Sequence, residues 1–252
     1  MKIVAIAVVT VRETLRRKVQ VNLLVFGTLL VLASYFLSQL TLGEQHRMIA
    51  DLGLSSMQLI GTLLAVFLGA ALVAGDVERR VVYPVVAKPV TRSQYLLGRY
   101  AGLSCALLLN LAVMAVALAA VLAVEAGSAK PLDRALLAAL GLMGVQVLVV
   151  AAVAVLFSSI SSSTLAAIFT LSVAAAGQLT NEVRNLWRGD GAWLARALWY
   201  ALPNLGALNG NEAVIYHRPP PASLWLPVAY AAFYAAATLA IACLAFERRD
   251  FR

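Results

Sequence analysis

Residues 101–124 read AGLSCALLLNLAVMAVALAAVLAV and contain no charged side chain. A helix of this length rises about 36 Å, because each residue adds 1.5 Å, whereas the hydrocarbon core of a bilayer is roughly 30 Å thick. A spanning segment must be helical, since an open strand would leave its peptide groups unpaired in lipid. The stretch Ala101–Val124 therefore predicts a transmembrane helix.

The rest of the chain has the same apolar character. Of its 252 residues, 62% are hydrophobic and only 13% are charged, about half the share that is usual in soluble domains. This composition excludes an ordinary soluble enzyme, because a single core could not bury so much apolar surface. We predict an all-α membrane protein with six transmembrane helices in one domain, residues 1–252. The other five predicted spans are Val19–Gln39, Met57–Ala74, Ala135–Phe157, Thr164–Leu179 and Leu224–Phe246.

The basic residues predict the orientation of the six spans. With the N-terminus in the cytosol, most of the 20 Lys and Arg residues, Arg99 among them, fall on the cytosolic side, as the positive-inside rule requires. Six spans also place the C-terminus in the cytosol. The formal net charge of +8 therefore reflects topology and contact with the lipid bilayer, and we expect no nucleic acid as a partner.

Residues 1–18 precede the first span and are too polar to form one. Apolar residues such as Ile3 and Ile6 are followed by Arg12, Arg16 and Arg17. This pattern predicts an amphipathic helix in the inner headgroup layer. A plain basic flank that only fixes topology explains the same residues equally well.

Residues 75–100 form a predicted cytosolic segment that is long for a simple connection between two helices. It mixes charged with apolar residues, and Pro84 and Pro89 interrupt any continuous helix. Thr91 or Ser93 is expected to cap the helix that becomes the third span. The segment suits docking to a cytosolic partner, and a solvated connection is an equally good interpretation.

Residues 180–223 form the longest predicted outer loop. Tryptophans and arginines alternate in its first half, and both residue types favour the headgroup layer. We predict short re-entrant or interfacial helices before the last span, which end near Leu202-Pro203-Asn204. The loop is interpreted either as a lid over an exit path or, with more weight, as an interfacial belt.

Motifs of catalysis are absent from the sequence. It contains no G-x-x-x-x-G-K-[ST], no H-E-x-x-H and no G-x-S-x-G, and its two histidines are far apart. The six spans as drawn contain no Asp, Glu, Lys or Arg, which disfavours a transporter driven by its own proton or ion relay. Amides are then the buried polar candidates and are expected to tie helices together. They are Gln39, Asn22, Asn110, Gln146 and Gln178.

Four stretches, in order along the chain, resemble the membrane subunits of ABC transporters of the type-2 exporter class. The first runs from Glu78-Arg79-Arg80 through Lys88-Pro89-Val90-Thr91-Arg92 to Leu97-Gly98-Arg99. The second is the serine-rich turn at 156–167, and the third is Trp199-Tyr200-Ala201-Leu202-Pro203-Asn204. The fourth is the C-terminal Phe246-Glu247-Arg248-Arg249.

The resemblance implies a permease in the bacterial cytoplasmic (inner) membrane that forms the translocation path with a second permease copy. Two copies of a separate ABC ATPase subunit would dock below and would hold the ATP and Mg, so that this chain needs no cofactor or metal and is not itself an enzyme. The resemblance also implies an outer-loop element of Trp199, Tyr200, Pro203 and Asn204. The implied ATPase-coupling residues are Glu78, Arg79, Arg80, Tyr83, Pro84, Val85, Lys88, Pro89, Thr91 and Arg92.

Other functions remain open at this point. A relative of this family could use the ATPase for mechanical or assembly work as a membrane anchor. A self-sufficient secondary transporter is the alternative outside the family, and an intramembrane enzyme is the least supported. The lack of charge in the predicted spans favours a hydrophobic or amphipathic cargo.

Overall fold

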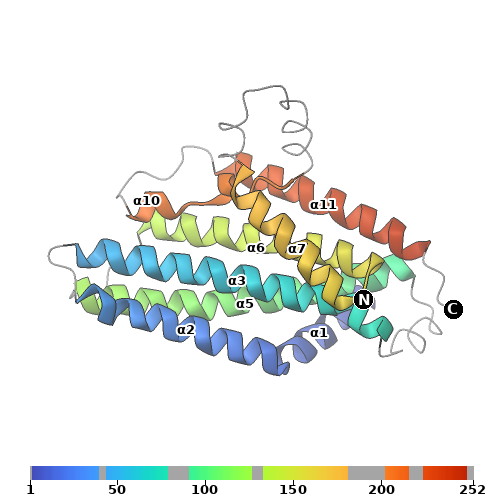
Figure 1. Ribbon diagram of the computed structural model, residues 1–252, viewed down its shortest axis with the longest axis horizontal. Coiled ribbons are helices and arrows are strands. Elements are labelled where there is room, and N and C mark those ends of the chain that lie inside the picture. The colour runs from blue at the N-terminus through green and yellow to red at the C-terminus, as the bar shows by residue number, and fades with distance from the viewer. Residues whose placement is uncertain are drawn as a thin grey trace.

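The computed structural model describes residues 2–39, 44–78, 91–126, 133–180, 202–215 and 224–248, and no strand occurs in these ranges (Figure 1). The first half of the chain forms α1 (Lys2–Leu15), α2 (Lys18–Ser38), α3 (Gln45–Glu78) and α5 (Arg92–Ala126). The second half forms α6 (Arg134–Ile160), α7 (Ser163–Gln178), the 3₁₀ turn η1 (Gly206–Leu208), α10 (Asn211–Ile215) and α11 (Trp225–Glu247).

Within the described residues, five helices are long and apolar enough to cross a membrane: α2, α3, α5, α6 and α11. The prediction of a helical, multi-pass membrane protein is confirmed at this level. The predicted span Thr164–Leu179 is also a helix, but α7 has only 16 residues and rises about 24 Å. The number of six spans and the placement of both termini stay predictions.

Two helices, α3 and α5, extend well beyond the spans predicted within them. α3 begins at Gln45, 12 residues before the predicted start at Met57, and ends at Glu78. α5 begins at Arg92, ahead of the predicted start at Ala101. The segment 75–100 is therefore helical at both ends, which corrects the prediction of one long connection. Apolar content marks where a helix crosses lipid, whereas the helix itself continues for as long as its backbone hydrogen bonds do.

α3 and α6 lie at the centre of the bundle. Most α6 residues between Met143 and Val155 are buried, and so are Leu64, Leu68 and Leu72 of α3. Figure 1 shows α3 between α2 and α6, with α7 crossing in front. The core of the bundle is therefore formed by residues of helices that are apolar on nearly every face.

The outer helices present large apolar side chains on the molecular surface. Phe36 on α2 is 73% exposed and Phe233 on α11 is 79% exposed. Leu165, Ile168 and Phe169 are exposed in the same way on α7. A surface of this kind is stable next to lipid and not next to water.

α1 packs closely against the start of α5 because two glycines of α5 leave room for it. A Cβ atom on Gly98 would lie 2.9 Å from the Cβ of Ile6, and one on Gly102 would lie 2.5 Å from the Cβ of Thr10. Small residues one turn apart allow this approach of two helix backbones. α1 is helical as predicted, and one face of it is covered by protein.

Candidate functional site

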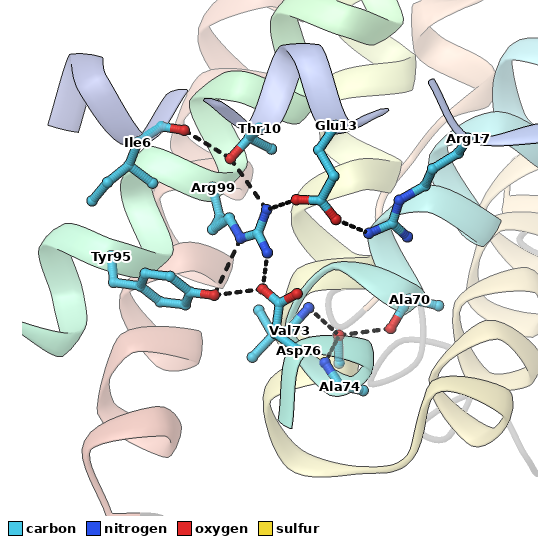
Figure 2. Close-up of polar contacts among 11 residues, drawn as sticks. Ile6, Thr10, Glu13, Arg17, Ala70, Val73, Ala74, Asp76, Tyr95 and Arg99 are labelled. Atoms are coloured by element: carbon cyan, nitrogen blue, oxygen red, sulfur yellow. Dashed lines mark hydrogen bonds and ion pairs between the residues drawn. The ribbon is translucent and has the colours of Figure 1, made fainter. Parts of the chain in front are cut away.

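Four ionisable side chains from three helices meet at one end of the bundle, which is called the charged end below. Glu13 comes from α1, Asp76 from the last turn of α3, and Tyr95 and Arg99 from the start of α5 (Figure 2). These four residues are called the charge cluster. In the sequence, Asp76 shortly precedes the segment 79–90, and α5 begins shortly after that segment.

Arg99 is the centre of the charge cluster. Its Nη2 donates to Asp76 Oδ2, its Nη1 donates to Glu13 Oε2 at 2.5 Å, and its Nε donates to the Tyr95 hydroxyl at 3.2 Å. The Tyr95 hydroxyl in turn donates to Asp76 Oδ2 at 2.5 Å. Nη1 also contacts Thr10 Oγ1 at 3.4 Å, while the Thr10 hydroxyl donates to Ile6 O. One guanidinium thus joins α1, α3 and α5.

Burial makes these contacts strong. The side chains of Asp76 and Arg99 are 6% and 7% exposed. A buried charge is tolerated only when it is paired and hydrogen-bonded, and the loss of one partner strands the other. Arg17 Nη2 adds a second cation, 2.7 Å from Glu13 Oε1, so that two carboxylates face two guanidinium groups. The cluster is therefore electrically balanced when Arg17 is counted with it.

Glu13 lies at the rim of the cluster, and its side chain is 38% exposed. Partial burial opposes its ionisation, but hydrogen bonds and charge from Arg99 and Arg17 outweigh that effect. The pKa of the Glu13 carboxyl is therefore held below its usual value of 4.5. Glu13 is thus a carboxylate at neutral pH.

Regular helix spacing brings these side chains together. Tyr95 and Arg99 are four residues apart and so lie on one face of α5. Thr10, Glu13 and Arg17 are three and four residues apart along α1 and the turn that follows it. Each helix therefore presents its polar groups toward the same place.

α11 is joined to the same end of the bundle by two further contacts. The ring of Tyr95 stacks on Phe246, with centroids 6.3 Å apart and planes 20° apart. Arg92 Nη1 donates to the backbone oxygen of Glu247 at 3.0 Å and lies 3.4 Å from that of Phe246. Basic side chains commonly bind the unpaired carbonyls at a helix C-terminus in this way.

Ser158 of α6 fixes the turn of α3 that precedes Asp76. Its hydroxyl donates to Ala70 O at 2.7 Å and accepts from Val73 N at 3.1 Å and Ala74 N at 2.9 Å (Figure 2). Serines in a turn such as 158–163 can satisfy local backbone groups. Ser159 and Ser161 do so, but Ser158 instead bonds to another helix, because it is buried against α3.

Two of the predicted coupling residues are fully described. Thr91 Oγ1 accepts from Gln94 N at 3.3 Å, which confirms the predicted cap of α5, and Arg92 binds the end of α11. Glu78 is the last residue of α3, and its side chain lies outside the described residues. The others also lie outside the described residues: Arg79, Arg80, Tyr83, Pro84, Val85, Lys88 and Pro89.

The predicted outer-loop element is described in its second half, since Trp199 and Tyr200 lie outside the described residues. Asn204 Oδ1 accepts from Ala207 N at 3.1 Å, and Asn204 N donates to the Tyr230 hydroxyl of α11 at 3.0 Å. Leu205 N donates to Gly177 O of α7 at 3.1 Å, beside Pro203. The Pro203-Asn204 turn thus joins α7 to α11. The short helices predicted to end at this turn lie outside the described residues, whereas η1 and α10 follow the turn and were not predicted.

The predicted buried amides differ in their burial. Asn110 and Gln146 are 1% exposed and contact amides of other helices, because Gln20 Nε2 donates to Asn110 Oδ1 at 3.3 Å and Gln58 Nε2 lies 3.5 Å from Gln146 Oε1. Their predicted role in tying helices is confirmed. The prediction is wrong for Asn22, which is exposed on α2, and for Gln39, which is exposed directly after it. Gln178 is half-buried.

Sequence reasoning missed the charge cluster, because it assigned Asp76 and Arg99 to a cytosolic segment between two spans and found no charge in the spans themselves. Both residues instead lie within long helices and are buried. A signal was present in the sequence: Tyr95 and Arg99 share one helical face with the close-packing Gly98 and Gly102 beside it. Charged residues at such a contact must find partners.

No group of three or more His, Cys, Asp or Glu side chains suited to a metal ion occurs among the residues that the structure describes. A comparison with models of known protein families gave no match, and no curated protein showed significant similarity. The charge cluster is thus the most distinctive described feature of the chain. Its chemistry suits holding helices in a fixed relation.

Proposed function

We propose that this chain is the membrane subunit of an ABC transporter of the type-2 exporter class. Two permease copies, or one copy and a relative, would form the translocation path in a bacterial cytoplasmic membrane. Each chain would cross it six times, with both termini inside. Two separate ATPase subunits would supply the energy, and the cargo would be hydrophobic or amphipathic.

The charge cluster is the observation that supports this proposal most. Asp76 and Arg99 join the two helices that flank the segment 79–90, and Glu13 and Tyr95 extend the connection to α1 and to Phe246 of α11. A push on that segment would therefore move four helix ends as one body. Rigid elements of this kind can carry a movement from a docking site into a bundle.

The segment that carries Glu78, Arg79, Arg80 and Tyr83 through Arg92 would be the part that the ATPase contacts. Its charged residues would pair with the ATPase, and its prolines and apolar residues would fill a hydrophobic contact. The short helix α1 packs on the start of α5, the helix that follows this segment. Arg99 joins α1 to α3 and α5, the two helices that flank the segment.

The first test is purification of the tagged chain in mild detergent from membranes of its native host. A P-loop ATPase should copurify, and it should be recovered several-fold less with E78Q/R92Q. The matched control is E44Q/R47Q, which also removes one acid and one base. Glu44 and Arg47 form an exposed ion pair, 3.0 Å apart, at the start of α3. Control and test variants should reach the membrane in equal amounts.

The proposal is wrong if no P-loop ATPase accompanies the wild-type chain, or if the isolated chain drives transport without nucleotide. ATP-dependent movement of a cargo into inverted vesicles would support export. A complex that hydrolyses ATP but moves no cargo would replace export with mechanical or assembly work.

A further inference from the structure

The outward face of α1 has a distinct composition. Val4, Val8 and Val9 are 65%, 47% and 63% exposed, and they cover the first two turns of this face. Arg12 and Arg16, four residues apart, continue the face toward the end of α1, and both are exposed. The opposite face buries Thr10 and Thr14 and packs on Gly98 and Gly102 of α5.

The basic part of this face lies where a long apolar helix begins. Lys18 is exposed and is the first residue of α2, which is apolar and long enough to cross a membrane. The cations Arg12, Arg16 and Lys18 are called the basic strip. A basic strip at the start of a spanning helix lies at the level of lipid headgroups.

The carboxylates beneath the strip do not neutralise it. Glu13 is bound by Arg17 and Arg99, and Asp76 is bound by Arg99. Among the described residues, Arg12, Arg16 and Lys18 form no ion pair. The charge cluster thus uses the nearby acids internally and leaves three cations facing outward.

We propose that the outward face of α1 binds anionic phospholipid headgroups of the leaflet at the charged end. Arg12 and Arg16 would hold phosphate oxygens with their planar donors, and Lys18 would add a point charge. Val4, Val8 and Val9 would contact acyl chains. Charge complementarity and the exposed apolar residues beside the cations together favour a lipid surface over a soluble acidic protein.

The inference does not depend on the proposed transport function. It predicts that the purified full chain prefers phosphatidylglycerol over phosphatidylcholine and that R12Q/R16Q weakens this preference about tenfold. The preference should also fall as the salt concentration rises. The measurement is native mass spectrometry of the chain in detergent micelles, titrated with each lipid separately.

The charge-matched control is R47Q/R134Q, which removes two exposed arginines from the starts of α3 and α6. It should leave the phosphatidylglycerol preference of the charged end unchanged. Equal thermal unfolding midpoints for the two variants and the wild type establish that α1 stays folded. If midpoints differ, K18Q alone replaces R12Q/R16Q, with R134Q as its control.

The proposal is overturned if R12Q/R16Q retains phosphatidylglycerol like the wild type, or if the control loses it equally. A variant that keeps its lipid but no longer copurifies a P-loop ATPase would assign this face to a protein partner instead. An unchanged ATPase recovery combined with lost lipid preference supports the proposal by itself.

Discussion

At the scale of single residues, Arg99 stays charged inside an apolar bundle because three oxygen groups surround it. Asp76 and Glu13 both pair with it, Arg17 supplies the second cation, and the Tyr95 hydroxyl binds both Arg99 and Asp76. Such an arrangement specifies one relative position of the helices, since a shift of any of them would leave a buried charge unpaired.

The first prediction concerns Asp76. Replacing it with Ala should lower the free energy of unfolding by about 3–5 kcal/mol, because the buried Arg99 loses its main partner. The double variant D76A/R99M should be more stable than D76A, since the stranded cation is removed as well. Denaturant titration of the purified chain in detergent micelles measures both effects.

The control for Asp76 is Glu44→Gln, which breaks an exposed ion pair with Arg47 and should cost less than about 1 kcal/mol. An Asp76→Ala variant as stable as the control would contradict the role assigned to the buried pair. So would a double variant less stable than D76A.

The second prediction concerns pH and Glu13. The pKa of Glu13 is lowered in the folded chain, so this residue contributes stability that is fully present above its unfolded value of 4.5. The contribution is lost as the pH falls through the lower folded value. Stability of the wild type and of Glu13→Gln, measured from pH 7 to pH 3, should therefore converge in acid. Parallel curves over that range would refute the prediction.

At the scale of elements, apolar content predicted where the helices lie, but it did not predict where they begin and end. Ala101–Val124 lies inside α5, but Arg92 to Tyr100 continue the same helix because Thr91 caps it and Arg99 and Arg92 find partners there. The partners come from α1, α3 and α11, and no local pattern indicates which helices will meet. Long-range contacts of this kind decide where a polar turn stays helical.

The third prediction tests the contact between α1 and α5. Gly102→Ala should lower the free energy of unfolding by about 1–3 kcal/mol, since the new Cβ would lie 2.5 Å from the Cβ of Thr10 and 2.6 Å from Ala7 O. Gly141→Ala on α6 is the matched control, because nothing lies within 4 Å of its Cβ position. That change should be neutral or slightly stabilising. Denaturant titration compares the two.

A Gly102→Ala variant no less stable than Gly141→Ala would show that α1 does not press on α5 at this place.

At the scale of the whole molecule, polar contacts gather at the two ends of an apolar bundle. The charge cluster and the Arg92 contact join α1, α3, α5 and α11 at the charged end. At the start of α3 and the end of α5, His46 Nδ1 lies 3.1 Å from Glu125 Oε2. Between these two ends, apolar packing and a few amide pairs hold the helices together. A movement that starts at the charged end would therefore break few polar contacts in the middle of the bundle.

The composition predicted a membrane protein, but it did not indicate which residues form the candidate site. Pro84, Pro89 and their neighbours could be singled out because mixed polarity between two spans is unusual. Asp76 and Arg99 could not, because their importance comes from burial, and burial depends on α1 packing over them. Glu13, which is 86 positions away from Arg99 in the sequence, completes the cluster.

The last prediction is the topology of the chain. Single cysteines placed in a background with Cys105 and Cys243 replaced should react with a membrane-impermeant maleimide in an alternating order. In intact cells Glu44, Asp133 and Glu212 should be labelled, whereas Thr91, Ser162 and Arg248 should be labelled only after permeabilisation. All six residues are exposed. The alternation follows because each pair of successive sites is separated by one predicted span.

The pair Ser162 and Glu212 decides the role of α7, which at 16 residues is the shortest predicted span. A helix that rises about 24 Å can cross only if the bilayer thins or flanking residues reach the headgroups. Labelling of Ser162 and Glu212 from the same side would make α7 re-entrant and reduce the chain to five crossings. It would also make α11 run antiparallel to α3, so that α11 would begin at the charged end. Arg92 binds the last carbonyls of α11 at the charged end, so α11 instead ends there. That contact therefore already favours opposite sides for the two positions.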